Sequence, residues 1–494
     1  MRNRMQHIIK MGSTVLLLTL VLYSCKVEPD RWDPRSENQV ITEYVETNEQ
    51  YSEFYGLLDS TGTSSLLAVR GPFTLFLPNN DAMNAYYTEK GISSYMDLSA
   101  EDQTELAMNH IVDAQIEAGG IGLGALPEVN GIGDYLVSEF DGADIIINKD
   151  SKIIDRDILT ANGVIHQVSK VLDPVKKSVY DVLADDPSYS IFAEGLSRTG
   201  LKDTLGVISF PFGKTTARTR FTILAIADTT FQRLGIPNID ALVAKYTNDP
   251  DNITDINNGF YRYMEYHCIA ETYYLSDLPL GAHNYPVLSY DNYVSIAVDK
   301  DYKINIETST GEYTHFIIDK SNIPGKNGTI HSVNKLLPVV QPAPAEIRWE
   351  TTDHFDLKQL DCFQNTYGRF FDGQNDFEDI KWEGSYLLYY FKLNQFNLLH
   401  DDMLSMQGWF WCEVTTPKIM KGHYKLTGNI WNNWVDYAVY VDGVNTALVK
   451  KSDPANTTLW GEFNFTKTER HKIRILATSP GILFWDYVTF TPIN

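Results

Sequence analysis

Histidine is the residue type in this chain whose spacing most suggests chemistry. Two histidines lie in nearly identical segments, "NGVIHQVSKVL" at 162–172 and "NGTIHSVNKLL" at 327–337. Two more occupy matching positions in "MNHIVDA" at 108–114 and "EYHCIAE" at 265–271. A histidine can act as a general base or as a ligand because its pKa lies near neutrality. In such segments it is more often a packed side chain that keeps a hydrogen bond, and we predict that structural role for all four: His110, His166, His267 and His331.

The other motif-like segments do not predict an enzyme. "GKTT" at 213–216 matches the end of a phosphate-binding loop, but Ile208 stands where that loop needs glycine. The acidic segment at 372–379 offers Asp372, Asn375 and Asp376 as oxygen ligands, yet their spacing fits no EF-hand, and a solvated loop explains it better. The chain has no nucleophile elbow and no zinc-protease motif. We predict no catalytic residue, no metal and no cofactor. A glycosidase carboxylate pair stays open, because nothing selects one pair.

Tryptophan marks the candidate ligand-binding residues. Eight of the nine tryptophans lie between positions 349 and 485. An aromatic ring can stack on the apolar face of a sugar, while nearby amides bond the sugar hydroxyls. In "NIWNNWVDY" tryptophans and asparagines lie together in a polar loop between two predicted strands. For these tryptophans a role in ligand binding and a role in packing are equally favoured. In "QGWFWCEV" they alternate along one strand, where packing is favoured. The candidates are Trp431, Asn432, Asn433 and Trp434 in the loop, and Trp409 and Trp411 in the strand.

The charge balance bears on the partner of this chain, and the cysteines bear on a disulfide. The chain carries 41 basic and 64 acidic residues, which argues against a nucleic-acid partner because phosphate binding needs a basic face. Cys362 and Cys412 lie in the last third, and the sequence leaves open whether they form a disulfide. Cys268 is then expected to be a buried small hydrophobic residue.

Residues 1–24 predict a secretory signal peptide, with basic residues before an apolar run at 15–23 that is too short to span a membrane. The run ends in "LYSC", which resembles the lipobox of bacterial lipoproteins. That resemblance implies cleavage before Cys25 and lipidation of its thiol, for example with palmitate, which anchors the protein to a membrane. Residues 25–38 form a polar, acidic tether similar to surface-export signals, so we expect an outer-membrane lipoprotein at the cell surface.

The segment at 162–172 recurs 165 residues later at 327–337, which predicts a duplicated domain. Further segments recur in the same order, with "TLFLPNNDAM" at 74–83 matching "TILAIADTTF" at 222–231. The offsets between copies are 148, 157 and 165 residues, so the second copy has gained loop insertions. Asn79, Asn80 and Asp81 in one copy, and Asp228 and Thr229 in the other, are residue types that cap helices. Asn-Gly at the start of the closing segment predicts a tight turn with positive φ.

The order of these segments resembles the fasciclin domain. A strand is followed by "PNNDAM", then by a histidine at a helix end, then by "NGVIH…KVL" near the domain end. The second copy departs from the family at "LAIAD", which lacks the proline that usually follows the strand. The resemblance implies two α/β domains, each a helical layer against a small β-wedge, at 39–175 and 176–340. Proline-rich 341–348 then predicts a linker.

Residues 349–494 predict an all-β domain. Segments 423–431, 435–443 and 482–492 alternate as strands do, and Asp442-Gly443 is a strong hairpin signal. Several short strands with turns between them predict a jelly-roll sandwich. Phrases such as "VTTPKIMKGHYKL" also resemble the carbohydrate-binding, galactose-binding-like modules. The whole chain is therefore expected to be a multidomain α+β protein.

Together these features predict a non-catalytic surface lipoprotein that binds an extracellular ligand, with a glycan as the leading candidate. The lipid anchor and the C-terminal module suggest an accessory component of an outer-membrane transporter complex for nutrient acquisition. A structural adhesin, or a complex subunit that acts through protein–protein contacts, is the alternative. A catalytic role for the sandwich is a third and weaker hypothesis.

Overall fold

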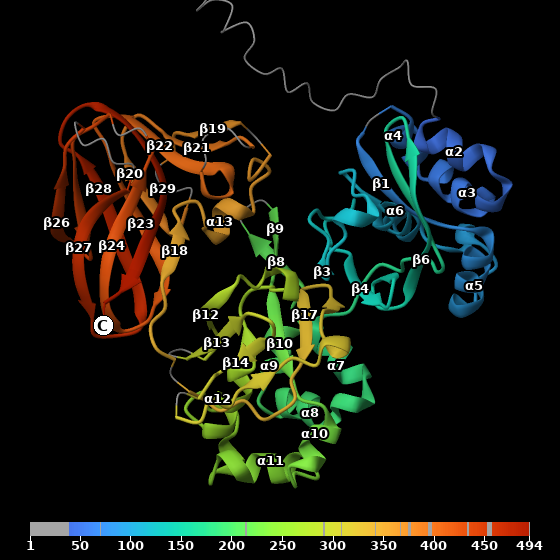
Figure 1. Ribbon diagram of the computed structural model, residues 1–494, viewed down its shortest axis with the longest axis horizontal. Helices are drawn as coiled ribbons and strands as arrows, with labels where there is room; N and C mark the ends of the chain where they lie inside the picture. Colours follow the sequence, from blue (N-terminus) through green and yellow to red (C-terminus); the bar gives the residue numbers. More distant parts are fainter. Residues whose placement is uncertain are drawn as a thin grey trace, which may run out of the picture. The chain divides into compact units, whose positions relative to one another are not determined.

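The computed structural model describes residues 39–494 except 70, 213–214, 290–291, 308, 341, 366, 374–376, 394–397, 432–433, 452–456 and 494 (Figure 1). Several predictions lie outside these residues: the signal peptide 1–24, lipidation of Cys25, the tether 25–38, the loop residues Asn432 and Asn433, and Asn375 and Asp376. The chain divides into two compact units with a boundary after Val175. Each unit is described by itself.

The first unit packs a layer of helices against one mixed sheet. Its core lies between α2–α6 and strands β1 and β7, and contains fully buried Phe54, Leu75 and Ile165. The helices are α2 (Ile41–Thr47), α3 (Ser52–Ser60), α4 (Thr63–Val69), α5 (Asn80–Lys90) and α6 (Ala100–Asn109). The strands are β1 (Phe73–Pro78), β2 (Ile111–Val112), β3 (Gly124–Ala125), β4 (Val137–Asp141), β5 (Asp144–Ile147), β6 (Ser151–Thr160) and β7 (Gly163–Val168), in the order β2-β1-β7-β6-β5-β4-β3.

The second unit begins with a domain of the same plan. Its helices are α7 (Val179–Asp185), α8 (Ser190–Arg198), α9 (Leu201–Leu205), α10 (Asp228–Arg233), α11 (Ile239–Tyr246) and α12 (Gly259–Tyr266). Its strands are β8 (Ser209–Phe212), β9 (Thr215–Arg218), β10 (Phe221–Ala225), β11 (Cys268–Ile269), β12 (Gly281–Pro286), β13 (Tyr293–Val298), β14 (Tyr302–Ile304), β15 (Thr314–His315), β16 (Ile323–Gly325) and β17 (Gly328–Ser332). The orders β11-β10-β17-β16 and β12-β13-β14-β15 replace the single sheet of the first unit.

The duplication predicted from the repeated segments is confirmed by the strand pairing. In the first copy β1 runs parallel to β7, with Phe73 opposite Gly163. In the second copy β10 runs parallel to β17, with Phe221 opposite Gly328. The strand containing each closing histidine therefore lies beside the strand that opens the β-wedge, at the same register in both copies.

The asparagine of each Asn-Gly pair joins the first helix of its domain to the helical segment that precedes the sheet. Asn162 Oδ1 accepts a hydrogen bond from Ile41 N at 2.9 Å, and its Nδ2 donates to Leu67 O at 2.6 Å. Asn327 makes the same two bonds, with Val179 N and Leu205 O, each at 2.9 Å. These side chains are buried, so the bonds satisfy backbone groups that water does not reach.

Each Asn-Gly pair lies at the tight turn that the sequence predicts, since Thr160 pairs with Gly163 and Gly325 with Gly328 across two residues. The glycine of each pair also has a second role. Gly163 has φ 157° and Gly328 has φ 152°, both positive as predicted. A Cβ atom would lie 2.1 Å from Phe73 O at Gly163 and 1.9 Å from Phe221 O at Gly328. Glycine is needed here because the parallel neighbour approaches too closely for any side chain.

The helix-capping prediction holds for one copy and is wrong for the other. Asn79 is the N-cap of α5 and accepts from Ala82 N at 2.9 Å. The N-cap of α10 is Ala227, so Asp228 does not cap its own helix. Asp228 Oδ1 instead accepts from Ile191 N at 3.0 Å, at the start of the neighbouring helix α8. Tertiary packing has redirected this carboxylate from its own helix to another.

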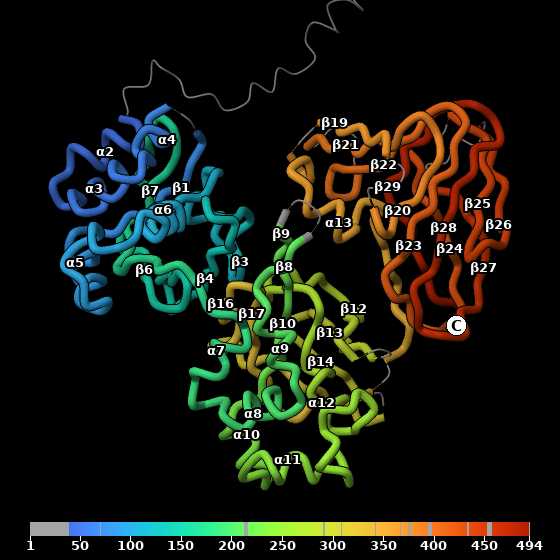
Figure 2. Tube along the Cα trace, turned by 180° about the vertical axis from the view of Figure 1, so that it is seen from behind, coloured from blue at the N-terminus to red at the C-terminus, as the bar shows by residue number. Residues whose placement is uncertain are grey.

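Residues 347–492 form the predicted antiparallel sandwich (Figure 1). One sheet has the order β19-β21-β22-β29-β24-β27, with β18 on β29, and the other has the order β20-β23-β28-β25-β26 (Figure 2). The elements are β18 (Ile347–Glu350), α13 (Phe355–Lys358), β19 (Gly368–Phe371), β20 (Ile380–Glu383), β21 (Leu387–Phe391), β22 (Asp402–Gly408), β23 (Trp411–Ile419), β24 (Gly422–Ile430), β25 (Tyr437–Val441), β26 (Val444–Val449), β27 (Thr457–Phe465), β28 (Glu469–Ala477) and β29 (Gly481–Pro492).

Two local predictions for this domain can be compared with the structure. Asp442 and Gly443 both have positive φ, 48° and 81°, and join β25 to β26 as the hairpin signal predicts. The predicted linker is shorter than 341–348, because β18 already begins at Ile347. Among the described residues, none of the helices is both long and apolar enough to cross a membrane.

Candidate functional site

The closing histidines are buried and held by backbone hydrogen bonds. His166 Nε2 lies 2.8 Å from Ile116 O, and its Nδ1 accepts from Asp157 N at 3.3 Å. His331 repeats this pattern with Tyr273 O at 2.9 Å and Asn322 N at 3.2 Å. Both ring nitrogens are used for structure in each copy, which confirms the structural prediction for this pair.

His110 and His267 are also structural. Each lies at the end of a helix, with Nδ1 2.8 Å from the carbonyl oxygen four residues earlier, at Leu106 and Tyr263 respectively. Burial lowers the pKa of both rings to about 4, so they are neutral at physiological pH. Neither histidine is accessible to a substrate, because both are fully buried.

The cysteines in the described residues are free thiols, so the disulfide left open between Cys362 and Cys412 is not formed. Cys412 lies on β23 with its side chain in the sandwich core, opposite Trp382 of β20. Burial raises the pKa of the Cys412 thiol to about 12, which makes it unreactive. Cys268 is buried as expected. No group of three or more His, Cys, Asp or Glu in the described part of the chain could hold a metal ion.

Trp409 and Trp411 differ in accessibility although they are two residues apart. Trp411 Nε1 donates to Glu383 at 2.8 Å, and the Arg474 guanidinium covers its ring at 4.5 Å from the centroid. Arg474 is itself bonded to Glu413 on the same strand as Trp411. Trp411 therefore belongs to a charged network on the sheet surface, whereas Trp409 is 64% exposed at the turn between β22 and β23.

Trp431 and Trp434 have separate roles around Phe484 of β29. Trp431 N donates to Phe484 O at 2.8 Å, and the two ring centroids are 5.5 Å apart. Trp431 also packs against a small buried cluster that includes Tyr390 and Met403. The Trp434 ring lies 6.2 Å from the Phe484 ring and is 56% exposed. Trp431 therefore supports the surface, and Trp434 presents a ring to solvent.

Strand register extends this surface across the sheet. Phe370 of β19 lies opposite Leu388, Leu388 lies opposite Ser405, and Ser405 lies opposite Phe484. Directly opposite residues point to the same face of a sheet, and adjacent strands are about 4.8 Å apart. A row of side chains about 14 Å long thus runs from Phe370 to Phe484 on the face away from the core, but it is not exposed throughout, because Ser405 in its middle is 3% exposed.

A second row lies beside the first. The Tyr386 ring lies 4.9 Å from the Phe370 ring, and its hydroxyl donates to Gln407 Oε1 at 2.9 Å. Gln407 pairs with Ile482, whose carbonyl accepts from Trp434 N at 3.3 Å. We name this surface the outer strip and define it as Phe370, Tyr386, Leu388, Gln407, Phe484 and Trp434.

Phe370 and Tyr386 were missed by sequence reasoning. Phe370 is 61% exposed, and neither residue lies in the tryptophan-rich segments from which the ligand-binding candidates were predicted. The alternation of "EGSYLLYYF" at 383–391 was the available signal, because its even-numbered positions 386, 388 and 390 share one face. The strip combines neutral aromatic rings with a hydroxyl and an amide, which can stack on and hydrogen-bond an uncharged ligand.

A cluster of buried carboxyl groups on the paired strands β22 and β29 was also missed. Asp402 begins β22 and Asp486 lies within β29, and they are 1% and 2% exposed. Asp402 accepts from Thr352 Oγ1 at 2.6 Å and from Tyr389 Oη at 3.0 Å. Asp486 accepts from Leu399 N at 3.3 Å. Burial is the main cause that raises the pKa of each to about 7.

Glu350 of β18 completes the carboxyl cluster. Its Oε2 lies 2.8 Å from His400 Nδ1, while its Oε1 is buried without a hydrogen bond to any described residue. Burial raises the pKa of Glu350, and the Glu350 contact raises that of His400. The two aspartates have almost no exposed surface. They can therefore take up protons as the pH falls, but they cannot contact a substrate.

Family membership follows from the duplicated domain. The model of the fasciclin domain matches residues 49–174 and 187–339, more than half of the chain. The chain belongs to the fasciclin family. The two fasciclin domains coincide with the two copies whose buried asparagine, glycine and histidine contacts are described above.

Several relatives share fasciclin domains over part of their length. Protein sll1483 of Synechocystis is 26% identical over 134 residues, which is 27% of this chain and 73% of that protein. Rabbit transforming growth factor-beta-induced protein ig-h3 is 27% identical over 201 residues, 41% of this chain and 27% of that protein. Human periostin is 29% identical over 143 residues, 28% of this chain and 16% of that protein. The match to the two animal proteins thus spans under a third of their length.

Solved structures resemble the two parts separately. The fasciclin domain pair of insect fasciclin I, a cell adhesion molecule, covers 60% of this chain and all of that chain, with 16% identity and a TM-score of 0.28. A family 35 carbohydrate-binding module from Clostridium thermocellum covers 26% of this chain and 98% of that module, with 12% identity and a TM-score of 0.18. The sandwich is established by its own strand order.

Proposed function

We propose that this fasciclin protein is a non-catalytic binding protein of the bacterial cell surface that retains a neutral glycan on the outer strip of its sandwich. The observation that carries the proposal is the exposed Trp434 ring beside Phe484, continued across the sheet by Phe370 and Tyr386. Flat aromatic rings with a nearby hydroxyl and amide suit a row of sugar rings. The strip of about 14 Å is long enough for several linked sugars rather than one.

The anchoring part of the proposal rests on the sequence. The "LYSC" segment at 22–25 supports lipidation of Cys25, and the acidic tether after it supports exposure on the outer membrane. On this proposal the fasciclin domains space the sandwich from the membrane or dock a partner, such as a transporter complex that takes up the glycan. Metabolic labelling with a palmitate analogue, compared between the natural chain and Cys25→Ala, tests the anchor.

The second candidate is an adhesin that acts through protein–protein contacts. Its support is the membership of two domains in the fasciclin family. Purification from detergent-solubilised envelopes separates the two candidates. A stoichiometric protein partner without glycan retention favours the adhesin, whereas glycan retention that depends on the outer strip favours the first proposal.

The outer strip is tested by Trp434→Ala in the chain that begins at Lys26. We expect up to about tenfold weaker retention on glycan affinity gels, because a stacked ring contributes up to ~1.5 kcal/mol. The stability of the variant should stay within about 0.5 kcal/mol of the natural chain, since the ring is more than half exposed. Electrophoretic retardation in gels of soluble polysaccharides measures the first quantity, and urea unfolding measures the second.

Trp409→Ala is the matched control, because Trp409 is equally exposed but lies outside the strip. Its retention should equal that of the natural chain. Trp431→Ala is expected to behave differently from Trp434→Ala and to lower stability, because Trp431 packs on a buried cluster. Equal loss of retention in the Trp409 and Trp434 variants would contradict the assignment of the site to the outer strip.

A further inference from the structure

The two fasciclin copies differ most in the outer strands of the wedge. In the first copy β6 runs unbroken from Ser151 to Thr160, with register irregularities between Ile153 and Ile158. In the second copy two short strands, β15 and β16, flank a single 3₁₀ turn, η7 (Ile318–Lys320). Since the buried contacts of the asparagine and of the closing histidine recur in both copies, this difference is not required by the fold.

One position beside these differing strands has the same backbone conformation in both copies. Asp157 and Asn322 occupy equivalent positions and have positive φ, 60° and 54°. Each donates its backbone N–H to the buried histidine of its copy, as described above. The side chain of Asp157 is also engaged, since its Oδ1 accepts from Ala118 N at 2.7 Å. The left-handed backbone at this position therefore belongs to the shared framework.

The residue directly before this position differs between the two copies. It is Arg156 in the first copy, where the side chain is exposed, and Ser321 in the second copy, where the residue is buried. Within the described part of the chain Arg156 forms no ion pair with a carboxylate. An arginine fork that is held beside a strand and has no carboxylate partner can bind an anion from solution in two parallel hydrogen bonds.

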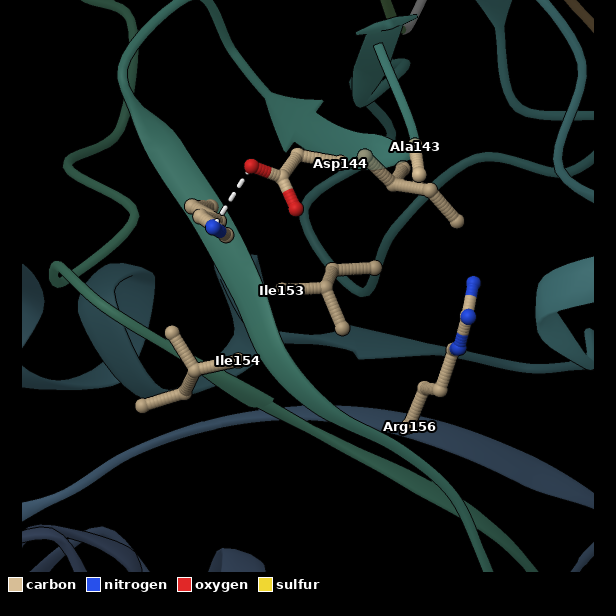
Figure 3. A pocket seen from close by; sticks show the side chains of 7 residues that line it. Ala143, Asp144, Ile153, Ile154 and Arg156 are labelled. Atoms are coloured by element: carbon tan, nitrogen blue, oxygen red, sulfur yellow. Dashed lines mark ion pairs between the residues drawn. The ribbon is translucent and has the colours of Figure 1, made fainter. Parts of the chain in front are cut away.

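Arg156 borders a small pocket between β5 and β6. The pocket has a volume of about 210 Å³ and is lined by Ile145, Ile153 and Ile154 together with Asp144, Lys152 and Arg156. Lys152 is already neutralised by Asp144 at 2.6 Å. In Figure 3, Ile153 lies between that ion pair and Arg156. Of the charged residues that line the pocket, Arg156 is therefore the one outside an ion pair, although the exposed Asp155 and Asp157 flank it in the chain.

We propose that this pocket of the first fasciclin domain binds an acidic sugar residue, with Arg156 holding its negative group above the largely buried Ile145 and Ile153. The pocket is smaller than the ~300–1,000 Å³ of sites for drug-sized ligands, so it accepts a single ring. The anionic group follows from Arg156 alone, because the chain as a whole carries a formal charge of −23 and repels anions elsewhere. The site is separate from the outer strip, and it does not depend on the function proposed for that strip.

The test is calorimetric titration of the chain from Lys26 with glucuronate, glucose 6-sulfate and glucose at low ionic strength. Glucuronate or the sulfate ester should bind and neutral glucose should not, and whichever anion binds more tightly identifies the preferred group. Arg156→Gln should weaken binding at least tenfold, and Arg156→Lys should weaken it less, because lysine keeps the charge but loses the fork.

Lys170→Gln is the matched control, because it removes the same charge from an exposed position in the same unit, where Lys170 pairs with Asp150 at 3.1 Å. It should leave the affinity unchanged. Equal weakening by Lys170→Gln, or binding of glucose as tight as that of glucuronate, would overturn the proposal. Binding of an acidic peptide in place of the acidic sugars, with the same dependence on Arg156, would overturn the assignment of the ligand as a sugar.

Discussion

Gly163→Ala and Gly328→Ala are each expected to destabilise their fasciclin domain by about 4 kcal/mol or more, a large part of the 5–15 kcal/mol that holds a domain folded. The added Cβ would lie 2.1 Å from Phe73 O in one copy and 1.9 Å from Phe221 O in the other. Those oxygens belong to the parallel neighbours β1 and β10, so relief requires the central strands of the wedge to separate. Urea unfolding followed by circular dichroism measures the effect.

The two substitutions should give similar losses, because the glycines have the same register and nearly the same φ. Gly119→Ala is the control, since a Cβ there meets nothing within 4 Å, and its effect should stay within about 0.5 kcal/mol. An unfolding transition of Gly163→Ala that superimposes on that of Gly119→Ala would show that the strands can move apart at little cost.

The second large effect is a rise in the stability of the sandwich as the pH falls from about 8 to about 5. The pKa of Asp402 and that of Asp486 are raised to about 7 in the folded state, against about 3.9 when unfolded. The folded state therefore binds protons more tightly, and protonation between these values stabilises it. Glu350 and His400 also have raised pKa values and act in the same direction. His354 of the same domain, whose pKa burial lowers to about 4, acts in the opposite direction below about pH 6.5, so the rise should be steepest between about pH 8 and about pH 6.5.

The size of this effect should be a few kcal/mol, because each pKa unit corresponds to about 1.4 kcal/mol and the aspartates are almost fully buried. Asp402→Asn removes one buried charge but keeps a group that can bond Thr352 and Tyr389. It should raise stability at pH 8 by about 2 kcal/mol and reduce the pH dependence. Glu462→Gln, an exposed carboxylate on β27, should change neither.

Denaturant unfolding at several pH values, with and without a chelator, measures this dependence. The chelator matters because a cation in solution could hold the carboxylates ionised and hide the proton effect. If stability instead falls as the pH is lowered in the presence of chelator, the carboxyl groups are ionised in the folded state and the assignment of raised pKa values is wrong.

The sequence by itself determined the duplication and much of the local structure. Repeats of Asn-Gly, His and Thr at constant order predicted two copies of one domain, and β1–β7 and β10–β17 pair identically. Asp442-Gly443 predicted the β25–β26 hairpin, because two residues with positive φ are a local requirement. Burial of the four repeated histidines was also predictable, since a side chain repeated in the same frame has the same neighbours.

Only the tertiary structure decided which tryptophans are accessible and which charges are buried together. Trp411 is covered by Arg474, which lies 63 positions later and reaches it from the next strand. Glu350, Asp402 and Asp486 meet because β18, β22 and β29 are adjacent, although nothing in their sequence spacing indicates it. The alternation of a strand shows that two faces exist, but not what lies on them. That depends on the strand order of the sandwich, which comes from contacts between residues far apart in the chain.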